Sequence, residues 1–162
     1  MVPIEELSVD GREAYTARDK RTIYVDKGVY SHKVPFRLRY TLAHELSHIL
    51  IHPYVFDAAD YETIQEFKKF LGSIPPEDLR TIESQAYRLA GLLLVPSPDL
   101  SREYLEVAGT LRENGLDIAK LASESLRQVA KVIGGRFQVS SNVIHRCAVR
   151  DGLWAWDDIE GL

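Results

Sequence analysis

Apolar side chains recur at helical spacing along most of the chain. The clearest segment lies between residues 36 and 51, where the helical repeat continues until Pro53 interrupts it. Proline and glycine residues mark the ends of the other helical segments. These further helices are expected over about residues 61–71, 77–95, 97–114, 117–133 and 140–150.

The amino-terminal part has a different pattern, which predicts a small sheet. Residues 14–18 and 21–25 alternate in polarity around a central Asp-Lys pair, as the two strands of a β-hairpin do. One face of this hairpin is expected to carry Tyr15, Ala17, Ile23 and Val25. A turn at residues 26–28 and a loop up to Pro35 follow, and residues 137–139 are expected to form a short extended piece. The expected fold is therefore a mainly helical α+β fold with a small sheet near the amino end.

Length and composition fit one globular domain. The chain has 162 residues, of which 45% are hydrophobic and 27% are charged, and a chain of this length can bury a sizeable core. We therefore expect a single domain over residues 1–162. The longest apolar run, residues 89–95, is far too short to cross a membrane. These values argue against fibrous, disordered and membrane-spanning proteins.

Two further features indicate a cytoplasmic protein. Residues 1–6 are acidic and lack the basic start and apolar core of a secretion signal. The single cysteine, Cys147, cannot form an intramolecular disulfide, which fits a reducing compartment. Its expected role is that of a small buried apolar side chain.

Charge is unevenly distributed along the chain. The net charge is -4, but residues 117–150 carry six basic and two acidic side chains, so this segment has a charge of +4 and the rest -8. The segment has two interpretations: a helix-turn-helix that binds DNA, or a solvated basic face on helices that pack against the rest of the domain. The acidic total and the absence of a clear turn glycine between two compact helices favour the second. Direct nucleic-acid binding is therefore not expected.

The strongest chemical motif is the sequence His-Glu-Leu-Ser-His at residues 44–48. On a helix, His44 and His48 lie one turn apart on the same face, where both imidazoles can reach one zinc ion. Glu45 comes from the next position and points beside the ion, where it could take a proton from an activated water and pass it to a leaving amine. Because the surrounding residues are apolar, these polar side chains would be costly there unless paired or metal-bound. We therefore expect two metal ligands and a general base.

A catalytic zinc ion needs three protein ligands and one open position, and two residues could provide the third ligand. His52 lies one further turn along the first helix, but one straight helix rarely supplies all three ligands. Glu83 lies at the edge of an apolar stripe on a later helix, where Ala86 and Ala90 permit a close helix contact. On spacing alone, Glu83 is equally compatible with a metal ligand and with an exposed surface residue.

Hydrolysis also needs a donor that stabilises the negative oxygen formed in the reaction. Five side chains could provide this donor. For each of them a structural role is the simpler interpretation, and their spacing in the sequence does not single out one as the donor. The candidates are Tyr40, Tyr54, Tyr87, Arg88 and His145.

Two stretches of the chain together resemble a known family. Residues 37–52 read Arg-Leu-Arg-Tyr-Thr-Leu-Ala-His-Glu-Leu-Ser-His-Ile-Leu-Ile-His, and residues 83–96 read Glu-Ser-Gln-Ala-Tyr-Arg-Leu-Ala-Gly-Leu-Leu-Leu-Val-Pro. They are similar to the active helix and the second helix of the ImmA/IrrE metallopeptidases, and residues 129–146 resemble the end of that domain more weakly. Two residues depart from the family pattern, namely Ser47 in place of Gly and Tyr87 in place of a common Asn. Neither position is a ligand.

The resemblance implies a zincin-like peptidase domain with a metal-site core over about residues 36–96 and a C-terminal helical part over about residues 97–150. It also implies that Glu83 is the third zinc ligand. Many members of the family cleave helix-turn-helix transcriptional repressors in bacterial or mobile-element circuits, and so release genes of a stress response. We therefore expect a zinc endopeptidase with narrow specificity for such a repressor. The alternative is a non-catalytic, zinc-stabilised module that binds a repressor or DNA.

Overall fold

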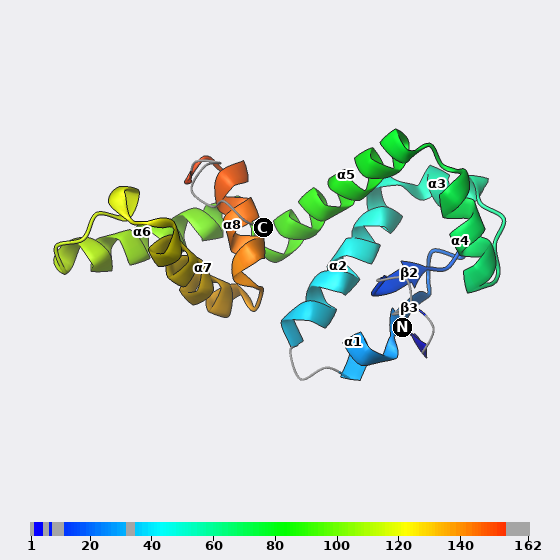
Figure 1. Ribbon diagram of the computed structural model, residues 1–162, viewed down its shortest axis with the longest axis horizontal. Coiled ribbons are helices and arrows are strands. Elements are labelled where there is room, and N and C mark those ends of the chain that lie inside the picture. The colour runs from blue at the N-terminus through cyan, green and yellow to red at the C-terminus, as the bar shows by residue number, and fades with distance from the viewer. Residues whose placement is uncertain (1, 5–6, 8–11, 32–34, 155–162) are drawn as a thin grey trace. The chain divides into compact units, whose positions relative to one another are not determined.

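The computed structural model describes residues 2–4, 7, 12–31 and 35–154 (Figure 1). It consists of two compact units, Met1–Ala90 and Gly91–Leu162, and the boundary falls inside helix α5 (Pro76–Leu94). The single domain expected over residues 1–162 stays a prediction. Among the described residues, no helix is both long enough and apolar enough to span a bilayer.

The first unit contains a three-stranded sheet. Its strands are β1 (Val2–Ile4), β2 (Ala14–Thr16) and β3 (Ile23–Asp26), in the order β1-β3-β2. Strand β2 is antiparallel to β3, which confirms the predicted hairpin, whereas β1 is parallel to β3 and was not predicted. The three residues of β1 are too few to show an alternating pattern. The fold is therefore α+β and mostly helical, as expected.

The predicted face of the hairpin is wrong. In the observed register Tyr15 lies opposite Tyr24, while Ala14 lies opposite Val25 and Thr16 opposite Ile23. Residues directly opposite each other in an antiparallel pair share a face. The turn is centred between residues 19 and 20, so each odd-numbered residue lies opposite an even-numbered one. Side chains alternate between the two faces along each strand. Tyr15 therefore shares a face with Tyr24 and not with Ile23 and Val25.

Both faces of the sheet are covered, so side chains on each face of the hairpin are buried. On one face, Ala14, Val25 and Val29 pack with Leu38 and Leu42 of α2 (Pro35–Ile51). On the other face lies a larger, aromatic-rich cluster that includes residues of α3 (Pro53–Ala58) and α4 (Ile64–Ser73). The buried members of this cluster are Leu7, Tyr15, Phe56, Ala59, Tyr61, Ile64 and Phe67.

The helices of the first unit agree with the prediction except for two short ones. Helices α2, α4 and α5 were predicted, whereas α1 (Lys27–Ser31) stands where a turn was expected, and α3 follows the break at Pro53. Pro53 ends α2 but also occupies the first turn of α3, where the missing N–H of proline costs nothing. Helix α4 begins with a capping box between Thr63 and Glu66. The middle of the loop expected before Pro35, residues 32–34, lies outside the described residues.

The second unit is helical throughout its described part. It contains α6 (Ser97–Glu113), the 3-10 helix η2 (Ile118–Lys120), α7 (Ser123–Phe137) and α8 (Ser141–Arg150). The single helix expected from Asp117 is wrong, because Asp117 caps only η2, through a hydrogen bond from the N–H of Ala119, and α7 starts separately. The expected stop at Gly134 and the extended piece at residues 137–139 are also wrong: α7 continues to Phe137 and ends at Gln138, which has a left-handed φ of 55°.

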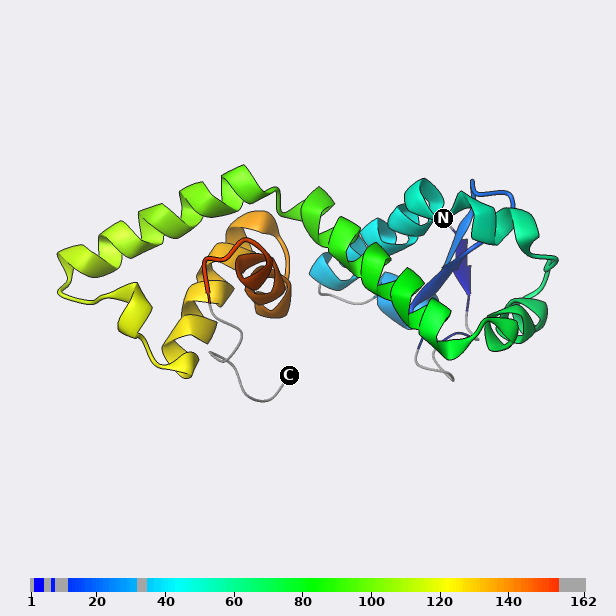
Figure 2. The ribbon, with the colours of Figure 1, turned by 90° about the horizontal axis from the view of Figure 1, so that it is seen from above.

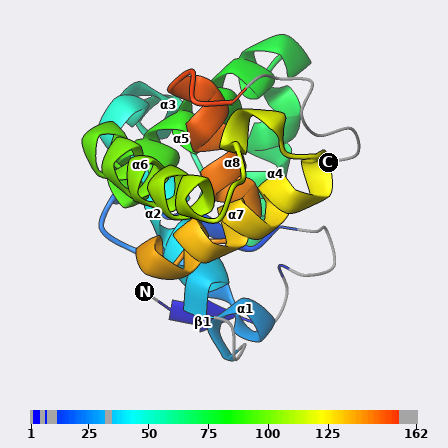
Figure 3. The same cartoon turned by 90° about the vertical axis from the view of Figure 1, so that its left-hand side faces the viewer.

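Gly134 lies inside α7, next to the turn that leads to α8. Helices α7 and α8 lie beside each other (Figure 3). A Cβ atom at Gly134 would lie 2.7 Å from the carbonyl oxygen of Val139, a buried residue. A Cβ atom at the neighbouring Gly135 would have no atom within 4 Å. The two adjacent glycines thus differ in their surroundings while sharing a helical backbone.

We expect opposite effects when each of these glycines is replaced by alanine. Gly134→Ala should lower the free energy of unfolding by about 1–3 kcal/mol, because backbone must move to admit the methyl group. Gly135→Ala should raise it by about 0.5–1 kcal/mol, because alanine favours the helix. Urea unfolding of both variants beside the wild type measures the difference. Equal stability of the two variants would contradict the close contact at Val139.

Candidate metal centre

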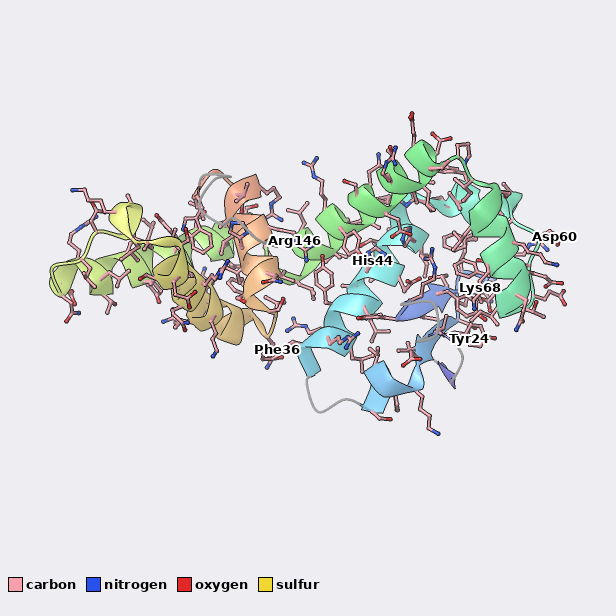
Figure 4. All side chains as sticks on the ribbon, in the orientation of Figure 1. Tyr24, Phe36, His44, Asp60, Lys68 and Arg146 are labelled. Atoms are coloured by element: carbon pink, nitrogen blue, oxygen red, sulfur yellow. The ribbon has the colours of Figure 1, made fainter. Side chains whose placement is uncertain are left out.

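Helices α2 and α5 bring three side chains together at the predicted site. His44 and His48 lie one turn apart on α2, and Glu83 projects from α5. The two helices lie near each other in both ribbon views (Figures 1 and 2). The Nε2 atoms of the two histidines are 3.1 Å apart, and Glu83 Oε2 lies 3.1 Å from His44 Nε2 and 3.7 Å from His48 Nε2. Figure 4 shows His44 between the two helices. One ligand atom from each side chain thus faces a common point.

These separations suit a tetrahedral zinc ion. Zinc lies about 2.0–2.1 Å from imidazole nitrogen and about 2.0–2.2 Å from carboxylate oxygen, so tetrahedral ligand atoms are roughly 3.3 Å apart. The three observed separations span 3.1 to 3.7 Å. Two imidazoles and one carboxylate also form a ligand set used by catalytic zinc, with a fourth position left for water. The donor atoms therefore fit the ion in number, type and spacing.

Glu83 is held in its charged form. Burial alone would raise its pKa, but the imidazoles of His44 and His48 beside the carboxylate outweigh burial and hold the pKa of Glu83 well below its ordinary value. The side chain is 28% exposed, and the guanidinium of Arg12 lies 3.9 Å from its other carboxylate oxygen. An ionised carboxylate is the form that binds a cation.

Glu45 lies outside the three-ligand cluster but borders the same cavity. It is only 8% exposed, and its Oε2 accepts a hydrogen bond of 2.9 Å from Thr16 Oγ1. Burial raises the pKa of Glu45, against the opposing influence of His48 and His44 and of the bond from Thr16. A raised pKa makes a carboxylate a better proton acceptor when it is ionised. The position and environment of Glu45 thus suit a general base.

Strand β2 provides the support for Glu45. The Tyr61 hydroxyl donates a hydrogen bond of 2.8 Å to the carbonyl oxygen of Thr16, so the strand is fixed at the residue that contacts Glu45. Burial also raises the pKa of Tyr61 above its ordinary value. Neither Thr16 nor Tyr61 was predicted, because each lies far from its partner in the sequence and no local pattern marks it.

The cavity beside the cluster is small and mainly apolar. It encloses about 50 Å³ of space open to the centre of a water molecule, which is enough for a few waters or a small apolar group. His44, Glu45, His48 and Glu83 form its polar side. The apolar lining comes mainly from α3, α4 and α5 and includes Val55, Phe56, Phe67, Phe70, Leu71, Leu79 and Ile82.

Two residues depart from the pattern of the family that the chain resembles, namely Ser47 and Tyr87. Their side chains have different surroundings. Ser47 is fully buried on α2 and donates a hydrogen bond of 2.7 Å to the carbonyl oxygen of Ala43, so its hydroxyl is satisfied within the helix. The ring of Tyr87 lies 4.4 Å from the ring of His44. Tyr87, one of the suggested donors to a reacting oxygen, thus lies next to His44. Arg12, which was not predicted, borders the same cavity.

His52 does not belong to the three-ligand cluster. Its Nδ1 lies 3.2 Å from Nδ1 of His48, on the opposite side of that ring from the Nε2 that faces Glu83. Of the two residues considered for the third ligand, Glu83 lies beside the Nε2 atoms of both His44 and His48, whereas His52 contacts His48 at Nδ1.

Carboxylates engage most of the basic side chains in residues 117–150. A tight turn at Gln138 does join α7 to α8, so the lack of a turn glycine was not a valid argument against a helix-turn-helix. The ion pairs support the interpretation as a solvated basic face, which stays a prediction. They join Lys120 to Asp117, Arg127 to Glu124, Arg136 to Glu103 and Glu106, and Arg150 to Asp151.

Comparisons of the chain with protein-family models, with curated proteins and with solved structures found no match. The residues and geometry of the site are therefore the basis for assigning a function.

Proposed function

We propose that the protein is a zinc-dependent endopeptidase with a zincin-like active site of the ImmA/IrrE type. The observation that carries the proposal is the position of Glu45. It is a buried carboxylate, next in sequence to a ligand, and it borders the same cavity as the ligands without belonging to their cluster. A zinc site that served only the fold would not need a buried carboxylate there, because burying a charged group is costly.

Each residue has a distinct role in the proposed reaction. His44, His48 and Glu83 would hold zinc, which supplies a Lewis acid that lowers the pKa of a water molecule and polarises the scissile carbonyl. Glu45 accepts a proton from the attacking water and delivers it to the nitrogen of the leaving amine. The hydrogen bond from Thr16 keeps the carboxylate of Glu45 in place.

The proposed substrate is a protein, and the resemblance of residues 37–52 and 83–96 points to a helix-turn-helix repressor in the cytoplasm. The narrow cavity supports selectivity, because only a small group fits it, and its apolar lining suits an apolar side chain near the scissile bond. Direct binding of nucleic acid is not part of the proposal. The engaged basic side chains of residues 117–150 leave little free positive charge for phosphates.

Metal content provides the first test. Elemental analysis of the purified chain, after zinc addition and removal of unbound ion, should give about one zinc per chain. Helix-turn-helix repressors from the same cell, purified and mixed one by one with the zinc-loaded protein, should include one that is cut at a single position, as mass spectrometry would show. A chain that takes up no zinc would overturn the proposal. Zinc uptake without cleavage of any repressor would favour the non-catalytic module.

A further inference from the structure

His52 is a buried polar side chain to which the proposed reaction assigns no role. It is 1% exposed and lies at the end of α2, between two polar partners. Its Nδ1 is 3.2 Å from Nδ1 of His48, and its Nε2 is 2.8 Å from Oε1 of Gln85 on α5. The three side chains thus form a line that starts at Gln85 and ends at a ligand.

The direction of these hydrogen bonds follows from the number of hydrogens available. A neutral imidazole carries one N–H and one lone pair. Because Gln85 presents its carbonyl oxygen, His52 donates through Nε2–H, and its Nδ1 is left with a lone pair. The contact between the two Nδ1 atoms then requires His48 to donate through Nδ1–H. This leaves the lone pair of His48 on Nε2, which faces His44 and Glu83.

The opposite orientation of the Gln85 amide would reverse every bond in the line. Its NH₂ group would donate to Nε2 of His52, His52 would donate through Nδ1–H, and His48 would carry its hydrogen on Nε2. That hydrogen would point at the place where the metal ligands meet. A nitrogen that carries a hydrogen cannot bind a metal ion, so only the first orientation prepares the site.

We propose that His52, held by Gln85, is a positioning residue that fixes the Nδ1–H form of His48 and so presents the lone pair of His48 Nε2 to the metal. The inference rests on the proposed metal site and adds an outer hydrogen-bond partner to it. Such partners orient metal-binding histidines and raise their basicity, and losing one costs about 10–100-fold in metal affinity. The other ligand has no such support: His44 Nδ1 is buried and has no hydrogen-bond partner among the described residues.

Two substitutions at His52 separate the hydrogen bond from the volume of the side chain. His52→Leu fills the space but cannot accept the hydrogen of His48, so zinc affinity should fall by about 10–100-fold. His52→Asn offers an amide oxygen to that hydrogen and should restore most of the affinity. Competition with a chromophoric chelator measures the zinc affinity of each full-length variant. Equal zinc affinity in His52→Leu and wild type would overturn the inference.

A substitution at Gln85 tests the same hydrogen bonds without changing a buried side chain, so misfolding at His52 cannot explain its result. Gln85 is an exposed residue, so Gln85→Leu should leave the fold intact but allow both forms of His48. The matched control is Gln128→Leu on α7, where the amide donates a hydrogen bond to the nearby Glu124. Gln85→Leu should weaken zinc binding, and Gln128→Leu should not. Unchanged affinity in Gln85→Leu would contradict the role given to Gln85.

The hydrogen position itself can be observed without metal. Long-range proton–nitrogen NMR of the metal-free chain, with ¹⁵N-labelled histidine, distinguishes a ring with Nδ1–H from one with Nε2–H. We expect His48 in the Nδ1–H form in the wild type and a mixture of forms in Gln85→Leu. An Nε2–H form in the wild type would overturn the inference. Because this measurement needs no zinc, it separates failure of the hydrogen-bond line from failure of the proposed metal site, which would appear as a wild type that binds no zinc.

Discussion

Replacement of Glu45 by glutamine is expected to lower the cleavage rate by about 10²–10⁴-fold while zinc binding is retained. The amide keeps the volume of the side chain and can still accept the hydrogen bond from Thr16, but it cannot take up a proton. Glu45 lies outside the ligand cluster, so the metal should remain. Single-turnover cleavage of the identified repressor, followed by gel electrophoresis, measures the rate, and elemental analysis measures the zinc.

Glu77→Gln is the matched control for this experiment. It makes the same chemical change at an exposed position in the first turn of α5, and both cleavage and zinc content should stay at the wild-type level. If Glu45→Gln cleaves as fast as Glu77→Gln, another group is the general base. If Glu45→Gln loses zinc together with activity, Glu45 takes part in the metal site, and its assignment as a base would lose its support.

Replacement of Glu83 by alanine is expected to have the largest effect on zinc affinity. It removes the carboxylate that lies 3.1 Å and 3.7 Å from the two histidine nitrogens and leaves two protein ligands. The loss should exceed the roughly 10–100-fold that follows from removing an outer hydrogen-bond partner, because a ligand itself is lost. Chelator competition measures the affinity, and circular dichroism shows whether the helices remain.

The control for this variant is Glu77→Ala, which makes the same substitution on the same helix at an exposed position. It should bind zinc as the wild type does. An affinity in Glu83→Ala equal to that of Glu77→Ala would mean that the third ligand is another residue, even if His44 and His48 bind the ion. The comparison therefore tests the assignment that the sequence pattern alone left undecided.

The parts of the fold that sequence analysis predicted are those specified by short-range patterns. Helical periodicity identified α2, α4, α5 and α6, and the pair at residues 19–20 located the hairpin turn. One error is local: a turn at residues 19–20 pairs Tyr15 with Tyr24, so Tyr15 could not share a face with Ile23. The other error has a tertiary origin. Gly134 was taken as a stop, whereas its lack of a side chain is needed for the contact with Val139 inside the structure.

The candidate site shows the same division. His44, Glu45 and His48 could be selected because their spacing on one helix has chemical meaning by itself. Glu83 was undecided on spacing and was assigned only through the resemblance, because its partners lie on another helix. Thr16 and Gln85 could not be selected at all. Their relevance depends on contacts with Glu45 and His52, which are distant in the sequence and are brought near only by folding.

The arrangement of ligands on two helices also has a thermodynamic consequence. An ion bound by α2 and α5 together acts as a removable cross-link between segments that α3 and α4 separate in the chain. Because the unfolded chain does not hold these ligand atoms together, the ion favours the folded state, by about 2.7 kcal/mol when its free concentration is 100 times the dissociation constant. The supply of zinc would thus set not only whether the proposed peptidase is active but also how long the folded chain persists against cellular proteases.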